Sequence, residues 1–153
     1  MPATTELETL LSMVDSTVND VLEYFAGSGA TNNARIGDWG AWEIMAHLVF
    51  WHEATANGME SAARGYGPYT VLHETDATNE EAIKRADGQG IHELVSRARE
   101  VQLSLKTSAR QLHELDIVVM ERPEAPDGMT SRQRLERILH HWKSHTDDLK
   151  ALG

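Results

Sequence analysis

The sequence contains no cysteine, which excludes disulfide bonds, thiolate metal ligands and a cysteine nucleophile. Basic residues are also in the minority, because 14 lysines and arginines stand against 24 acidic residues and the formal net charge is −10. A chain of this charge is repelled by a phosphate backbone unless it carries a strong basic patch. Its only local basic cluster is Arg132, Arg134 and Arg137, which Glu136 dilutes. Nucleic-acid binding is therefore not expected.

Long apolar runs are absent as well. No stretch approaches the roughly 20 apolar residues that a membrane span needs, and residues 1–16 show neither the basic start nor the apolar run of a signal peptide. We therefore expect a cytoplasmic protein with no membrane contact. The composition is ordinary for a folded protein, with 153 residues, 41% of them hydrophobic and 25% charged. This size and composition predict a single domain over residues 1–153 with its own core.

Apolar residues recur at spacings of three and four in several long segments, which is the pattern of amphipathic helices. The predicted main helices cover residues 5–26, 38–63, 91–114 and 131–151, and a short helix covers 79–86. Helix starts are predicted from residues that cap the first turn. These are the pairs Thr5 and Glu8, Thr78 and Glu81, and Thr130 and Gln133, together with Asp38.

No alternating strand pattern persists in the sequence. Residues 116–120, "DIVVM", form the only strand-like run, and residues 122–128 are predicted to be a loop. Four main helices with a long connection between the second and the third predict an all-α fold, a four-helix bundle with a crossover. A homodimeric coiled coil formed by residues 91–114 is the competing interpretation, but three further helices in the same chain favour the bundle.

Three histidines lie close together in "RILHHWKSHTDDL", residues 137–149. At about 100° per residue, His145 falls within the apolar stripe of this helix and His141 at its edge, whereas His140 points to solvent. His47 lies in the middle of the apolar stripe of the second helix. His52 is about 140° from His47 around that helix, so the two cannot share a site.

The pair His141 and His145 places two imidazoles one turn apart, a geometry that lets both bind one metal ion. His47 is the best candidate for a third ligand, because a bare imidazole on an apolar face is costly unless something satisfies it. The alternative is that all three are packing residues with hydrogen-bond partners. Glu43, one turn before His47, is either a group that orients its ring or a solvated glutamate. The four tryptophans are expected in the core.

The segments "DWGAWEIMAHLVFWHE", "TNEEAI" and "HHWKSHTDDLKAL" resemble, in this order, the motifs of the DinB/YfiT-like superfamily. The first resembles that family's second helix, the second its Asn-containing start of the third helix, and the last its HxxxH motif. The resemblance implies a four-helix bundle whose three histidines, here His47, His141 and His145, bind one divalent metal ion, often zinc or nickel. Bundles of this family often pair, so a homodimer is an open expectation.

Relatives in that superfamily include mycothiol-dependent maleylpyruvate isomerase and bacillithiol transferases, and the "WHE" after "AHLVF" is similar to a colibactin self-resistance branch. Because the chain has no cysteine, a thiol would come from a low-molecular-weight cosubstrate. We therefore expect a metal-dependent transferase or isomerase that activates such a thiol and acts on a small-molecule substrate. A metal-dependent hydrolase with Glu43 as base, a sequestering resistance protein and a non-catalytic bundle are the alternatives.

Substrate-binding residues are not defined by the sequence. Tyr66 and Tyr69 lie in a glycine-rich stretch that either overhangs a pocket or packs as an ordinary loop. Arg134 and Arg137 lie within about 40° of His141 on the helical wheel. They either reach the mouth of the site or are surface charges.

Overall fold

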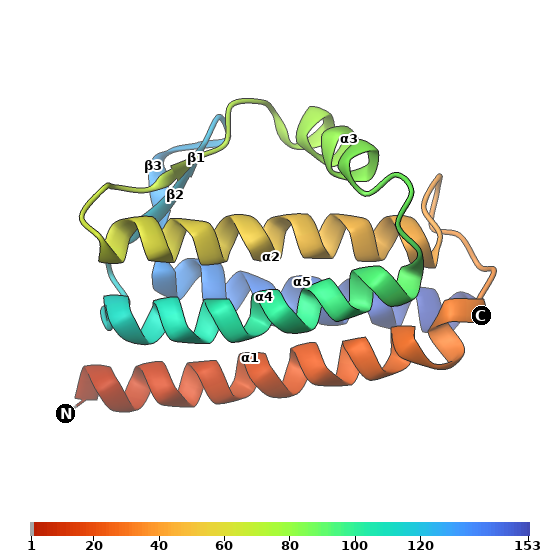
Figure 1. Ribbon diagram of the computed structural model, residues 1–153, viewed down its shortest axis with the longest axis horizontal. Coiled ribbons are helices and arrows are strands. Elements are labelled where there is room, and N and C mark those ends of the chain that lie inside the picture. The colour runs from red at the N-terminus through yellow and green to blue at the C-terminus, as the bar shows by residue number, and fades with distance from the viewer. Residues whose placement is uncertain (1) are drawn as a thin grey trace.

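The structure is a computed structural model, and it describes residues 2–153, with side chains from residue 5 onward. Four long helices lie side by side along its longest dimension (Figure 1). They are α1 (Pro2–Ala26), α2 (Ala41–Ala63), α4 (Ile91–Leu112) and α5 (Ser131–Leu152). Helix α2 packs against α4 and α5, and α1 packs against the same two helices. The prediction of a mostly helical protein is therefore confirmed.

The long connection between α2 and α4 carries its own structure. It contains strand β1 (Tyr69–Thr70) and helix α3 (Thr75–Arg85), and both lie over α2 in Figure 1. A short 3-10 helix, η1 (Ser28–Thr31), joins α1 to the segment before α2. The predicted short helix at 79–86 is present and begins four residues earlier than expected.

The all-α prediction is wrong in one region, because residues 118–130 form a β-hairpin. Strand β2 (Val118–Arg122) pairs antiparallel with β3 (Ala125–Thr130) and parallel with β1, which gives a three-stranded sheet. Residues 122–128 were expected to be a loop because they contain two prolines and Gly128. An edge strand tolerates proline, and β3 is at the edge of this sheet.

The hairpin sits on α2 at a glycine. A Cβ atom at Gly58 would lie 2.1 Å from the carbonyl oxygen of Val119 in β2, closer than any such contact allows. A glycine in the interior of a helix is unfavourable by itself. At this position it lets the backbone of β2 approach α2, and this contact fixes the sheet on the outside of the helical layer.

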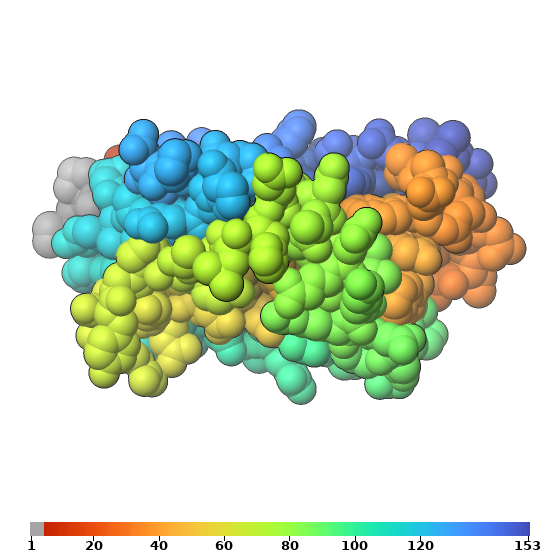
Figure 2. All heavy atoms as spheres, turned by 90° about the horizontal axis from the view of Figure 1, so that it is seen from above, coloured from red at the N-terminus to blue at the C-terminus, as the bar shows by residue number. Residues whose placement is uncertain are grey.

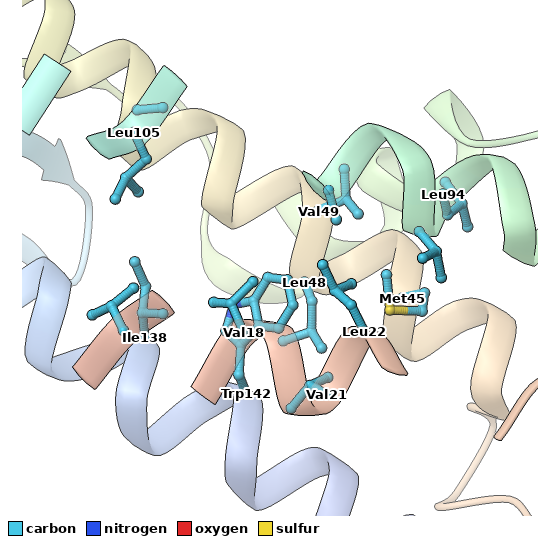
Figure 3. Close-up of a cluster of buried hydrophobic side chains, with 14 of the residues drawn as sticks. Val18, Val21, Leu22, Met45, Leu48, Val49, Leu94, Leu105, Ile138 and Trp142 are labelled. Carbon is cyan, nitrogen blue, oxygen red and sulfur yellow. The ribbon is translucent and has the colours of Figure 1, made fainter. Parts of the chain in front are cut away.

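The main hydrophobic core lies between the four long helices (Figure 3). Val18 and Leu22 of α1, Leu48 of α2, Leu105 of α4 and Trp142 of α5 are almost completely buried. Each such side chain contributes about 1.5–3 kcal/mol through removal of apolar surface from water. A second, smaller cluster under the sheet is formed by Trp51, Ala54, Val71 and Met120. None of the helices in the described residues combines the length and apolar character needed to cross a bilayer.

The predicted helix starts are partly wrong. The Thr130 hydroxyl accepts a hydrogen bond from the Gln133 N–H, and the Gln133 side chain accepts one from the Thr130 N–H, so this capping box is confirmed. Thr5 and Thr78 lie inside α1 and α3 rather than at their starts. Helix α2 begins after Gly40, not at Asp38.

Candidate metal centre

The structure brings together the three histidines that the sequence singled out. His47 comes from the second turn of α2, and His141 and His145 come from successive turns of α5. One ring nitrogen of each lies within 4.8 Å of the corresponding nitrogen of the other two. The Nε2 atoms of His47 and His141 are 2.8 Å apart. His47 is buried, whereas the other two histidines are half-buried.

This arrangement could hold a metal ion. Two nitrogen ligands, each about 2.0–2.1 Å from a tetrahedral zinc ion, lie roughly 3.3 Å apart. The two Nε2 atoms of His47 and His141, 2.8 Å apart, are at hydrogen-bond distance, and they would separate by about half an ångström to bind one tetrahedral ion. All three donors are imidazole nitrogens, which suit zinc, nickel, iron(II) and copper. The residues present therefore fit a divalent cation.

Asn79, at the centre of α3, sets the proton position of His47. Its Oδ1 atom lies 2.8 Å from the indole Nε1 of Trp51 and 3.0 Å from Nδ1 of His47. The indole N–H can only donate, so Oδ1 is the acceptor at this point. Nδ1 of His47 must then carry a proton, and Nε2 carries a free lone pair. That lone pair faces Nε2 of His141, 2.8 Å away, on the side where an ion shared by the two rings would be bound.

All three imidazoles are held in the neutral form. Burial lowers the pKa of His47 to about 3, with repulsion by His145 adding to it. Burial and the neighbouring His47 and His145 lower the pKa of His141 to about 2, and burial also lowers the pKa of His145. Arg137 opposes protonation of all three by Coulomb repulsion. At neutral pH the donor set is therefore uncharged and its lone pairs are available.

Trp39 forms an apolar wall beside the cluster. Its ring centroid lies 4.8 Å from that of His47 and 6.3 Å from that of His145. This tryptophan is half-buried and packs against the histidines, whereas Trp51 and Trp142 are buried in the two cores, as expected. Trp42 is half-buried and donates its indole N–H to the carbonyl of Gln89.

His140 and His52 lie where the helical wheel predicts. His140 is exposed on α5. His52 is completely buried on another face of α2, and its Nε2 lies 2.7 Å from Oε1 of Gln102 in α4. It therefore belongs to the helix interface and not to the cluster.

Glu43 does not orient His47. Its carboxylate accepts the Gly40 N–H at 3.0 Å and lies 3.8 Å from the guanidinium of Arg35. The group that holds the His47 ring is Asn79, which reasoning from helix periodicity missed. Asn79 is part of the "TNEEAI" motif, but no pattern in the sequence indicates that its side chain contacts α2.

The two arginines have different places in the fold. Arg134 is 3% exposed, so its interpretation as a surface charge is wrong. Arg137 is exposed, one turn before His141. Tyr69 is part of β1 and packs with the Trp51 cluster, and Tyr66 is exposed.

Comparison of the chain with protein-family models, with curated proteins and with solved structures gave no match.

Proposed function

We propose that the protein is a divalent-metal-dependent enzyme of the DinB-like type, a transferase or isomerase that activates a low-molecular-weight thiol. The observation that carries this proposal is the neutral three-histidine cluster, in which Asn79 leaves Nε2 of His47 free to bind a cation. His47, His141 and His145 would be the ligands, and zinc or nickel the ion. Membership of the DinB/YfiT-like superfamily and a homodimeric state are part of the same proposal.

The composition of the donor set supports thiol activation. Three neutral ligands cancel none of the ion's charge, and a divalent cation held by them would act as a Lewis acid that lowers the pKa of a thiol ligand. The chain has no cysteine of its own, so the thiol would be a small molecule. Trp39 packs against one side of the cluster and gives it an apolar boundary there.

Hydrolysis is the competing reaction class, and it has less support. The base that the sequence suggested for it, Glu43, caps the start of α2 through the Gly40 N–H. A base committed to a helix start is not available to take a proton from water.

The test is spectroscopic. The protein, without a histidine tag, is stripped of metal, reconstituted with cobalt(II) and titrated with a small thiol such as N-acetylcysteine. We expect cobalt d–d bands of a low-coordinate site and, on adding thiol, a sulfur-to-cobalt charge-transfer band that saturates. His145→Ala should lose both signals, and His140→Ala, which removes an exposed histidine from the same helix, should keep them. Cobalt bands without any response to thiol would refute thiol activation and favour hydrolysis.

A further inference from the structure

A solvent-open cavity of about 350 Å³ lies between the β2–β3 hairpin and α5, and its lining on α5 ends at Arg137, one turn before His141. Arg122, Gly128, Met129, Gln133 and Arg137 are among its lining residues. Its volume is that of a small-molecule site. Arg137 connects it to the candidate metal centre, because this residue lies one turn before His141 on α5 and repels a proton on each of the three histidines.

The cavity is positively charged in a chain whose net charge is −10. Arg122 is held in place by Thr75, which accepts a hydrogen bond from its Nη2 at 3.1 Å, and by Glu124 at 3.6 Å. Glu124 is the one acidic residue in the lining. Arg137 forms no hydrogen bond or ion pair within residues 5–153, so its guanidinium is available to a ligand.

A third arginine lies directly behind the cavity wall. Two nitrogens of Arg134 donate to the Thr55 hydroxyl, at 2.9 and 3.1 Å, and its Nη1 is 4.0 Å from the Met129 sulfur. No carboxylate in the described part of the chain pairs with it, although it is 3% exposed. A buried cation without a counter-ion is unfavourable, and its field in a low-dielectric wall attracts an anion into the cavity.

The arginines are physically linked to the histidines through Trp51. The guanidinium carbons of Arg122 and Arg134 lie 5.3 and 5.9 Å from the centre of a Trp51 ring. The indole N–H of Trp51 donates to the same Asn79 oxygen that holds His47. Figure 2 shows this face of the molecule, with the crossover residues in yellow-green and green beside the hairpin in light blue.

We propose that this cavity binds an oxyanion, a carboxylate or a phosphate, carried by the molecule whose reacting atom reaches the histidine cluster. Arg137 and Arg122 would donate to the anion directly, and Arg134 would add its charge from behind Met129. This inference rests on the proposed function in one respect, because that function makes the bound anion part of the substrate or of the thiol cosubstrate. The ligand would be a small anionic molecule. Its acidic group would lie at Arg137 and its reacting atom at the histidines, which begin one turn further along α5 at His141.

The experiment is an NMR titration of the zinc-loaded, ¹⁵N-labelled full-length chain with inorganic phosphate and, separately, with acetate. Ionic strength is held constant with sodium chloride. The signals followed are the indole N–H of Trp51, assigned from the spectrum of Trp51→Phe, and the arginine Nε–H groups. We expect shifts that saturate with at least one of the two anions, and the stronger binder identifies the acidic group.

Three variants locate the anion. Arg137→Gln should weaken binding at least about tenfold, the factor expected for loss of a charge-assisted hydrogen bond. Arg99→Gln, which removes the same charge from an exposed position on α4, should bind as the wild type does. His145→Ala, which removes a candidate metal ligand, should still bind the anion.

Shifts that grow linearly without saturation, or equal affinity in Arg137→Gln and wild type, would overturn the anion site. Loss of binding in His145→Ala with retention in Arg137→Gln would place the anion on the metal and also overturn it. The metal content of each sample separates the two proposals. Saturable binding that depends on Arg137 in a protein without metal would support the anion site and refute the proposed function.

Discussion

Replacement of Asn79 by leucine should weaken metal binding without touching any of the three histidines. In the structure, the side-chain oxygen of Asn79 accepts hydrogen bonds from the ring N–H groups of both His47 and Trp51. Leucine has a similar volume and cannot accept either bond. The His47 ring would then lose the partner that keeps its proton on Nδ1, and the tautomer with a proton on Nε2, which cannot bind a metal, would become populated.

The size of the effect follows from the burial of His47, which is 4% exposed. A buried N–H left without an acceptor costs about 1–3 kcal/mol. Removal of a group that orients a metal-binding histidine lowers metal affinity by about 10- to 100-fold, which corresponds to roughly 1.4–2.7 kcal/mol. The two ranges overlap, so we expect a loss of zinc affinity of about 10- to 100-fold. The free energy of unfolding should fall by on the order of 2 kcal/mol, because Trp51 loses its acceptor as well.

The assay is competition for zinc between the protein and a chromophoric chelator, with folding checked by circular dichroism. Asn79→Asp is the matched control, because a carboxylate still accepts both bonds and should keep the affinity at or above that of the wild type. Trp51→Phe removes the other donor and should leave zinc affinity nearly unchanged. A folded Asn79→Leu protein that binds zinc as tightly as the wild type would refute the reasoning.

Three further predictions concern stability. Burial lowers the pKa of His52 to about 4; the unfolded chain therefore takes up a proton that the folded chain does not, and stability falls as the pH decreases from about 6.5 to 4. We would measure the free energy of unfolding by urea titration across this pH range. His52→Leu should reduce the slope of that free energy against pH by up to about 1.4 kcal/mol per pH unit, and an unchanged slope would contradict this. Gly58→Ala should destabilise by at least about 1–3 kcal/mol, measured by denaturant unfolding, because its Cβ meets the Val119 carbonyl. Thr130→Ala should lower the unfolding free energy by about 1 kcal/mol through loss of the cap on Gln133, and a shift below 0.3 kcal/mol would argue against a stabilising cap.

The long helices could be predicted because their apolar residues have a clear period. In α1, Leu7, Leu11, Val14, Val18 and Leu22 are spaced by three and four, and all are buried. Such a stripe defines both the helix and its buried face. The same kind of periodicity in α5 predicts that His145 faces the interior of the bundle and that His140 faces solvent. The structure agrees for both.

The hairpin and the helix starts could not be predicted in this way. Pro123, Pro126 and Gly128 indicate a loop when only local preferences are considered. Strand β3 forms because β2 is held on α2 at Gly58 and offers its open edge for pairing. Capping spacing is also a local signal, and Thr78 satisfies it while its hydroxyl bonds the Glu74 carbonyl inside the helix.

The candidate metal ligands on regular helices could be predicted from the sequence. The residues that reach the site from the crossover, or that are buried by distant contacts, could not. His47 and His141 are 94 residues apart, yet each is marked by its place on an apolar face. Asn79 reaches the cluster from the crossover, where no period indicates the direction of its side chain. Arg134 has the sequence environment of a surface residue, and only the packing of Thr55 and Met129 around it shows that it is buried.

The most direct test of the account is the metal content of the protein, purified without a histidine tag and measured by elemental mass spectrometry. We predict close to one divalent ion per chain in the wild type and in His140→Ala. His47→Ala, His141→Ala and His145→Ala should each lose the ion while remaining folded. A wild-type protein that contains no metal, even after reconstitution with zinc or nickel, would contradict the account and leave the three histidines as packing residues.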